Sequence, residues 1–291
     1  GIGWSQAINP PTIVPAVVTS DVMPKNGSQD ARLLSEGILN KGIHITSDKP
    51  IVAYSHIYNS RASGATILFP TNTLGKTYYS INFTNQTNED NSHCFFYAVA
   101  TDTGTTTLRI VPSKATLTHP AGVPFTVNLS QGQVFNALGQ LSGSSGGNTF
   151  TAVDLTGSKI ESIASGTGAC KRIAVFSGSG KINISCGDNG QGATSSDNYM
   201  VQNFPKDAWG KKFLTSPTQV LDRNLFRVCV SDPAAIVKVN NQPITNYGPL
   251  TSSFYYEISA TNSPLKIESD IPITVSQYIS SSGGCSNPGD L

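Results

Sequence analysis

Apolar and polar residues alternate in short runs along most of the chain, which is the pattern of half-buried β-strands. In PFTVNLS, for example, Phe125, Val127 and Leu129 share one face. Other runs of this kind, each closed by Gly, Pro, Asn or Asp, are FFYAVATD, TTLRIVP, LFRVCVSD, AIVKVNN and SFYYEIS. Only SQDARLLSEGI and PKDAWGKKF indicate helical turns, and both are short. The pattern predicts an all-β fold built from many short strands.

Several of these strands recur in the same order, which indicates an internal repeat. The segments IVAYSH, IAVFSG and ITVSQY match one another and begin at Ile51, Ile173 and Ile273. The segment LFPTNTLGKTYY, from Leu68, matches NFPKDAWGKKFL, from Asn203. Each of these two segments is followed by a pair of strands and then by an alternating strand, FTVNLS or FYYEIS. We align these last two strands with each other, and we align Trp209 with Leu74 as a residue of a core or module junction.

The repeat unit of about 100–120 residues has the size of a β-sandwich and is too long for a propeller blade. We therefore predict tandem β-sandwich-like modules. Residues 1–67 would supply only the closing strands of a first module. Residues 68–200 would form a second module and residues 201–291 a third, in a chain long enough for more than one core.

The composition narrows the classes of function. Charged residues make up 13% of the chain, against an ordinary share of about 25%, and the formal net charge is +1. The chain therefore lacks the electrostatic signature of nucleic-acid binding. No apolar run is long enough to span a membrane, so we expect no membrane insertion. A surface rich in Ser, Thr and Asn favours an extracellular setting, and both ends of the sequence suggest a part of a larger polypeptide.

The cysteines indicate one disulfide. Cys170 and Cys186 flank two strand-like runs joined by GSG, and a hairpin of this kind would bring the two thiols together. The alternative is a pair of buried thiols. The pairing of Cys94, Cys229 and Cys285 stays open. The sequence contains no CxxC motif and no Cys–His spacing suited to zinc.

One segment, CGDNGQGATSSDN, offers hard oxygen ligands for a cation. Asp188 and Asp197 are the candidate calcium ligands, since carboxylate oxygens are what Ca²⁺ prefers. The segment lacks the order of an EF-hand and its closing Glu, and a turn-rich loop is the alternative. Apart from this calcium candidate, we expect no cofactor.

A stripe of Tyr54, His56 and Tyr58 occupies one face of a predicted strand in TSDKPIVAYSHIYNSRASGA. Among the three copies of this strand the opposite face keeps Ile, Ala or Val, whereas the stripe changes. We therefore expect Ile51 and Ala53 in a core, and the stripe in solvent or against a neighbouring module. Aromatic side chains with polar tips are favoured at interfaces, which makes the stripe our candidate partner-binding site.

Motifs for catalysis are missing from the sequence. There is no phosphate loop and no dinucleotide fingerprint. The SDN at Ser196–Asn198 has no S-x-x-K before it, and no pair among the acidic residues is marked as a glycosidase pair. We predict no catalytic residues and no enzymatic activity, and a secreted carbohydrate-active hydrolase is the least favoured alternative.

Two long blocks carry a family resemblance: GILNKGIHITSDKPIVAYSHIYNSRASGATILFPTNTLGKTYYSINFT and SSDNYMVQNFPKDAWGKKFLTSP. They resemble the bacterial branch of the family named for the IgG-Fc-binding protein N-terminal domain. The resemblance implies a large, all-β, non-enzymatic extracellular region of the kind found in Bacteroidetes surface or secreted proteins, described as adhesin-like or gliding-associated.

On this basis we expect a cell-surface or secreted region that binds a protein or a glycan through its sandwich surfaces. A structural stalk or spacer is the alternative. IgG binding is not carried over from the family name, because no residue motif for it is defined in this sequence.

Overall fold

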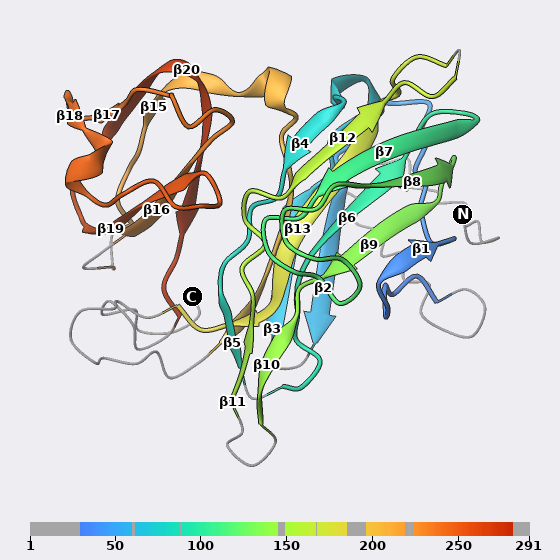
Figure 1. Cartoon of the computed structure of the whole chain (residues 1–291), viewed down its shortest axis with the longest axis horizontal. Coiled ribbons are helices and arrows are strands. Elements are labelled where there is room, and N and C mark those ends of the chain that lie inside the picture. Colours follow the sequence, from blue (N-terminus) through green and yellow to red (C-terminus); the bar gives the residue numbers. More distant parts are fainter. Residues whose placement is uncertain are drawn as a thin grey trace, which may run out of the picture.

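The computed structural model describes residues 30–59, 62–87, 89–144, 149–166, 168–184, 196–218, 221 and 224–281. Within these residues the chain forms β-strands and three 3-10 turns but no α-helix, which confirms the all-β prediction. Residues 30–38 of the segment SQDARLLSEGI form no helical turn, so that prediction is wrong. Figure 1 shows the strands in two groups, with β15 to β20 on one side and the other strands on the opposite side.

The larger group, called the N-terminal sandwich below, consists of two main antiparallel sheets. The first has the order β1-β9-β6-β13-β14 and the second the order β4-β12-β7-β8. In the first sheet the strands are β1 (Gly37–Leu39), β9 (Val134–Leu138), β6 (Cys94–Ala100), β13 (Ile173–Ile182) and β14 (Asp197–Gln202). In the second they are β4 (Thr77–Tyr79), β12 (Lys159–Ile163), β7 (Thr105–Val111) and β8 (Phe125–Ser130).

Alternate residues of the two main sheets meet in one core, as the sequence pattern predicts for half-buried strands. The core residues from six of these strands include Tyr78, Phe96, Leu108, Phe135, Ile160 and Val175. A small third sheet, with the order β10 (Leu141–Ser144), β11 (Thr149–Ala152) and β5 (Asn85–Thr87), extends the sandwich at its lower end in Figure 1.

The smaller group, called the C-terminal sheet below, has the order β18-β17-β20-β16-β19, and β15 also pairs with β20. Its strands are β15 (Gly210–Leu214), β16 (Asn224–Val230), β17 (Val237–Val239), β18 (Gln242–Pro243), β19 (Tyr255–Thr261) and β20 (Lys266–Tyr278). The first half of β20 pairs with β15 and β17, and its second half pairs with β16. The sheet folds around its own core, which includes Phe226, Val237, Ile258 and Ile267.

The strand pairing repeats as the sequence does. In the N-terminal sandwich β12 lies between β4 and β7, and β13 lies beside β6. In the C-terminal sheet the first half of β20 lies between β15 and β17, and its second half lies beside β16. Both β12 and the first half of β20 begin with the sequence KIES. The single strand β20 therefore takes the places of both β12 and β13.

One part of the repeat alignment is corrected by this pairing. The segment FTVNLS forms β8, which pairs with β7, whereas FYYEIS lies in β19, which pairs with β16. Because β9 pairs with β6 in the other copy, β19 corresponds to β9, and β18 takes the place of β8. Alternation alone cannot separate the segments FTVNLS and FYYEIS, since each is buried on one face only.

The two LFP and NFP segments form the same local structure. Each has a short 3-10 turn after a proline, η2 (Thr71–Thr73) and η3 (Lys206–Ala208), so PKDAWGKKF does contain a helical turn. Each turn ends at a buried apolar residue, Leu74 or Trp209, whose backbone N–H donates to the first residue of the turn. Trp209 packs on Tyr79 with 5.3 Å between the ring centroids, which confirms that it is a buried equivalent of Leu74.

The two turns also pack against each other. The rings of Phe69 and Phe204, which are equivalent residues of the repeat, lie with their centroids 4.7 Å apart. A Cβ atom at Gly75 would overlap Pro205, so this position requires a glycine. The repeat thus places two equivalent segments side by side where the N-terminal sandwich meets the chain that leads into the C-terminal sheet.

The remaining two strands, β2 (Tyr54–Asn59) and β3 (Ala62–Ile67), form a separate antiparallel hairpin. Hydrogen bonds from side chains place β3 next to β14. The described part of residues 1–67 therefore contributes β1 to the main sheet and the hairpin beside it. Whether residues 1–67, 68–200 and 201–291 fold as separate modules stays a prediction.

Glu36 fastens the segment before β1 to the sandwich. Its carboxylate accepts hydrogen bonds from the Thr116 hydroxyl (2.8 Å) and the backbone N–H groups of Thr118 (3.1 Å) and Leu138 (2.8 Å). The His119 ring nitrogen lies 3.3 Å from the same carboxylate. Burial tends to raise the pKa of Glu36, but hydrogen bonds from the Thr118 hydroxyl, the Leu138 N–H and the Thr116 hydroxyl outweigh it and hold the pKa below its ordinary value.

We expect Glu36→Gln to lower the free energy of unfolding by about 1–3 kcal/mol at pH 7, because a buried carboxylate with several donors is lost. The folded-state pKa of Glu36 is below the unfolded value, so its contribution is present above about pH 4.3 and is lost as the pH falls through the folded pKa. Urea denaturation of both proteins between pH 7 and pH 3 should show their difference shrinking. An equal difference at every pH would contradict this role.

A second prediction concerns Gly157, which lies where the two parts of the chain touch. Its φ is +83°, and a Cβ atom there would overlap the carbonyl oxygen of Ser253. Gly122 has a similar φ of +72° but open space around it. We expect Gly122→Ala to cost about 1 kcal/mol for backbone strain alone, and Gly157→Ala to cost clearly more. Equal losses in thermal unfolding would show that the close approach to Ser253 is unimportant.

Candidate functional site

The predicted partner-binding stripe lies on β2. Tyr54 and His56 are exposed, as the repeat predicts, whereas the side chain of Tyr58 lies outside the described residues. In the hairpin Tyr54 is opposite Ile67 and His56 is opposite Ala65, so these four residues share one face. Ile67 is exposed as well. The face thus combines an aromatic ring, an imidazole and an aliphatic side chain, and its role in binding stays a prediction.

The opposite side of this segment differs from the prediction. Ile51, which we expected in a core, is exposed and precedes the first residue of β2. Ala53 is half-buried, and its carbonyl accepts a hydrogen bond from the Leu68 N–H (2.9 Å). Among the described strands only β3 pairs with β2, and Ile51 is 56% exposed.

Hydrogen bonds from β14 and the residues beside it hold the hairpin in place. The Thr66 hydroxyl accepts a bond from the Gln202 N–H (2.9 Å), and the Gln202 side chain accepts one from the Phe69 N–H (2.7 Å). Thr66 and Gln202 are both buried. The side chain of Asp197 accepts a further bond from the Ser63 N–H (2.6 Å). These hydrogen bonds therefore fix the position of the hairpin that carries the exposed face.

The same bond gives Asp197 a structural role. Its carboxylate also accepts a hydrogen bond from the Asn198 N–H (2.7 Å), so it fixes the backbone of β3 and β14. The other calcium candidate, Asp188, lies outside the described residues. Within those residues no group of three or more His, Cys, Asp or Glu side chains is arranged to hold a metal. Calcium binding stays a prediction.

The described cysteines form no disulfide with one another. Cys94 and Cys229 are buried in different sheets, Cys94 as a thiol that donates to the Phe83 carbonyl (3.0 Å). Burial raises the pKa of the Cys229 thiol to about 12, which keeps it protonated and unreactive at neutral pH. Cys170 is half-buried, and its predicted partner Cys186 lies outside the described residues, so this disulfide stays a prediction.

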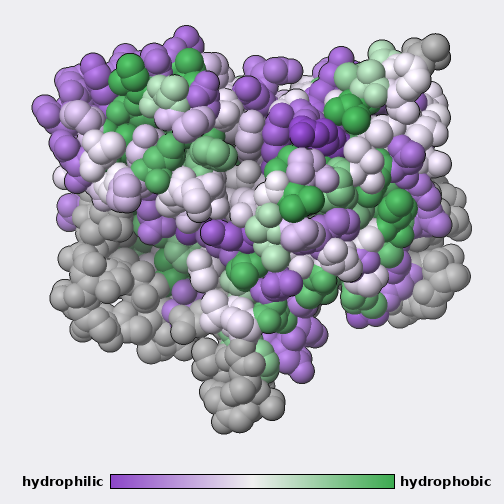
Figure 2. All heavy atoms as spheres, in the orientation of Figure 1, coloured by the Kyte–Doolittle hydropathy of each residue, from purple (hydrophilic) through white to green (hydrophobic). Residues whose placement is uncertain are grey.

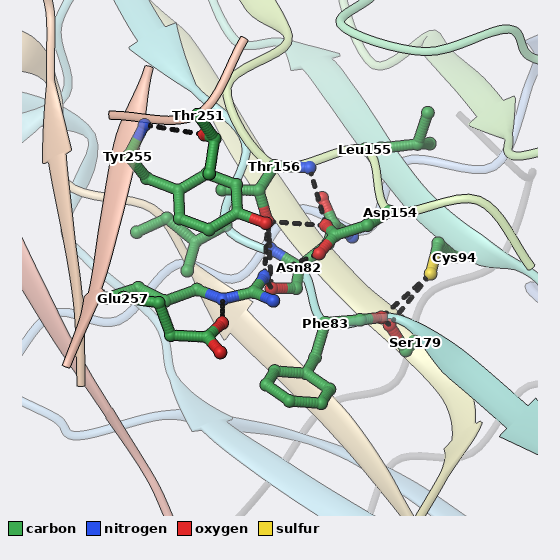
Figure 3. A network of polar contacts seen from close by, with 12 residues as sticks. Asn82, Phe83, Cys94, Asp154, Leu155, Thr156, Ser179, Thr251, Tyr255 and Glu257 are labelled. Atoms are coloured by element: carbon green, nitrogen blue, oxygen red, sulfur yellow. Dashed lines mark hydrogen bonds and ion pairs between the residues drawn. The ribbon is translucent and has the colours of Figure 1, made fainter. Parts of the chain in front are cut away.

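The sequence reasoning missed the most heavily connected polar group, Arg227 on β16. Its guanidinium Nη1 lies 2.7 Å from the Asn82 carbonyl, 2.6 Å from the Asp154 carboxylate and 3.1 Å from the Thr156 hydroxyl. These three acceptors all belong to the N-terminal sandwich. Its Nε donates to Glu257 of β19 (3.0 Å). Figure 3 shows these acceptors converging from the two parts of the chain.

Aromatic rings enclose the same guanidinium. Its central carbon lies 4.4 Å from the ring centroids of both Phe83 and Tyr255, and 5.5 Å from that of Tyr278. Contacts of this kind between a cation and ring faces stabilise a desolvated charge. The Tyr278 hydroxyl donates to the Asn82 carbonyl (2.9 Å), so the rings and the polar acceptors form one assembly.

Electrostatics keeps this arginine charged although it is buried. Burial acts to lower the pKa of Arg227, but Asp154, the nearby tyrosines and Glu257 hold it above its ordinary value. A buried charge is tolerated when it is paired and hydrogen-bonded, and it is costly once one partner is removed. The assembly therefore forms a junction between the N-terminal sandwich and the C-terminal sheet.

A signal for this junction was present in the sequence. In LFRVCV a charged residue interrupts an apolar strand, at the position that Tyr97 occupies in the equivalent strand FFYAVA. The pairing confirms this equivalence, because Tyr97 lies opposite Phe176 and Arg227 lies opposite Ser276. Its acceptors, however, are dozens of residues away in the chain, and no sequence pattern names them.

We expect Arg227→Met to lower the free energy of unfolding by about 3–5 kcal/mol, because the buried acceptors lose their donor. Arg109→Met is the matched control: Arg109 also binds a carboxylate on a strand, Glu161 at 2.8 Å, but its side chain is 41% exposed against 3% for Arg227. The control should lose at most about 1 kcal/mol. Chemical denaturation measures the free energy of unfolding of the two variants. Similar decreases in the two variants would contradict the junction assigned to Arg227.

Comparison with known proteins places the chain in a family. Residues 64–291, more than three quarters of the chain, match the family described as IgGFc binding protein. A search of curated proteins and a search of solved structures each found no match. Among the described residues no helix is long and apolar enough to cross a membrane. The family is one of extracellular protein-binding domains and not a known class of enzymes. The chain belongs to the IgGFc binding protein family.

Proposed function

We propose that this chain is an adhesin-like interaction region without catalytic activity, part of a larger polypeptide that is secreted or displayed on a bacterial cell. The sequence blocks favour the Bacteroidetes-type, gliding-associated branch of the family. The partner is a protein or a glycan, and it is contacted by the face of the β2–β3 hairpin. The observation that carries this proposal is the exposure of Tyr54 and His56 on a hairpin that β14 supports.

The chemistry of this face suits recognition. Tyr54 and His56 present rings with polar tips, and Ile67 adds an aliphatic surface beside Tyr54. Such side chains can pack against apolar groups and hydrogen-bond at the same time, on protein surfaces as on sugar faces. The formal net charge of +1 indicates that contact would depend only weakly on salt.

Two observations support the absence of catalysis. A hollow beside β7 and β12 is lined by Thr106, Ser162, Lys171 and neighbouring residues; it has a volume of about 20 Å³ and no His or carboxylate in its lining. Ligand pockets are ordinarily larger, about 300–1,000 Å³. The buried thiol of Cys229, held in its neutral form, is unsuited to act as a nucleophile.

A structural spacer is the second candidate, and the Arg227 junction favours it. A junction that fixes two units relative to each other is what a stiff stalk requires. The face drawn in Figure 2 is also a mosaic, in which hydrophobic residues occur in small groups between polar ones. A spacer would present no recognition surface at β2.

The two functions are separated by a binding experiment with the IgG Fc fragment, chosen from the family's name, and with a glycan array as probes. For whichever probe binds the chain, we expect the variant Tyr54→Ala, His56→Ala to bind at least ten-fold more weakly, because interface energy concentrates in a few aromatic residues. Tyr247→Ala, which removes an exposed tyrosine from the C-terminal sheet, is the control and should bind normally.

Unchanged binding in the double variant would exclude the hairpin face as the site. Absence of binding to both kinds of probe would favour the spacer.

A further inference from the structure

The β2–β3 hairpin is a second copy of the pair β13–β14. Tyr54 is opposite Ile67, and at the equivalent positions of the repeat Phe176 is opposite Gln202. The neighbouring residue pairs also agree. Ser55 lies opposite Thr66 in the β2–β3 hairpin, and β13 and β14 pair in the equivalent register. Since both hairpins lead directly into the LFP or NFP segment, their positions in the repeat are the same.

The hydrogen bonds of the two hairpins agree as well. The Ala53 carbonyl accepts from the Leu68 N–H (2.9 Å), and the equivalent Val175 carbonyl accepts from the Asn203 N–H (2.8 Å). In an antiparallel ladder successive residues direct their backbone groups to opposite sides. The backbone of Tyr54 therefore points away from β3, toward the other edge of β2.

In both complete copies a strand covers that other edge. β6 pairs along β13, with Tyr97 opposite Phe176 and Ala100 opposite Ile173. β16 pairs in the same way along the second half of β20. In the described part of the chain β2 pairs with β3 alone, and it begins only at Tyr54, where β3 begins to pair with it.

Apolar side chains beside this open edge are exposed to solvent, whereas the equivalent side chains in the copy that contains β13 are buried. The exposed fractions are 56%, 68% and 66% for Ile51, Val52 and Tyr54, against 0%, 8% and 7% for the equivalent Ile173, Ala174 and Phe176. Residues 51–59 also carry no Lys, Arg, Asp or Glu, the side chains that ordinarily discourage strand addition at an edge. The segment has the chemistry of a central strand at an edge position.

We infer that the edge of β2 away from β3 binds an antiparallel strand of the β6 and β16 type, supplied by a further unit of the same repeat. This inference rests on the larger polypeptide proposed above, and goes beyond the proposed recognition face because it depends on the backbone of β2. The strand that fits has large apolar residues at alternate positions, as in CFFYAVA and NLFRVCV. In strand addition of this kind, backbone hydrogen bonds form along the edge, and every second side chain of the added strand makes contacts as well.

The repeat also specifies the register. Because Tyr54 is equivalent to Phe176, the incoming strand should place its residue equivalent to Tyr97 opposite Tyr54. Ile51 would then lie opposite the residue equivalent to Ala100. The added strand would cover Ile51 and Val52 and would pair with the backbone N–H of Tyr54.

The test uses the full chain and a fluorescent peptide with the sequence of residues 92–101, in which Ser replaces Cys94 and a lysine tag adds solubility. Fluorescence anisotropy should show saturable binding, and hydrogen exchange should show slower exchange of the Tyr54 amide. Tyr54→Pro removes this outward N–H and no bond to β3, so we expect at least ten-fold weaker binding. Tyr54→Val keeps the N–H and should bind within about three-fold of the wild type. Thermal unfolding of both variants verifies that they fold.

A peptide of scrambled order, which lacks the alternation, should not bind. Absence of saturable binding by the native-order peptide, or equal binding by Tyr54→Pro and the wild type, would overturn the inference. Self-association of the chain through β2 without peptide binding would also overturn it, because the occupant would then be a second copy. Tyr54→Val separates this inference from the proposed function, since it should weaken recognition by the Tyr54 side chain while leaving peptide binding intact.

Discussion

The burial of the Arg227 guanidinium is the constraint on which the arrangement of the two parts of this protein depends. The arginine belongs to the C-terminal sheet, but three of its acceptors, at Asn82, Asp154 and Thr156, belong to the N-terminal sandwich. A charge withdrawn from water must keep its partners, so the two parts are held in one orientation. The close approach of Gly157 to Ser253 lies at the same boundary, and the rings of Phe69 and Phe204 pack where the chain leads into the C-terminal sheet.

An internal repeat explains why such a junction can form. The strands of the C-terminal sheet pair in the same arrangement as those of the N-terminal sandwich but use fewer residues. The single strand β20 takes the places of both β12 and β13. Equivalent strands then face different neighbours, and the side chains diverge accordingly: Tyr97 of one copy becomes Arg227 of the other. The β2–β3 hairpin is the third and shortest version of this arrangement, and its uncovered edge follows from the lack of a β6-type strand among the described residues.

Much of the fold could be predicted from local patterns. Alternation identified the strands, and the repeat placed Trp209 in a buried position and Tyr54 in solvent. Alternation led us to align β19 with β8, because FTVNLS and FYYEIS both alternate, whereas the true counterpart β9 is buried on both faces. The comparison of the three repeat copies placed Ile51 in a core, which would require a covering strand that no described segment provides. The acceptors of Arg227 depend on contacts between distant parts of the chain, which local patterns do not encode.

The coupling between Arg227 and Asp154 tests the junction most directly. A double-mutant cycle with Arg227→Met, Asp154→Asn and their combination, followed by chemical denaturation of the full chain, measures it. We expect the double variant to lose at least about 1 kcal/mol less than the two single losses added together, as for residues that share a buried bond. Losses that add to within about 0.5 kcal/mol would show that the two side chains act independently and would contradict the central role of the junction.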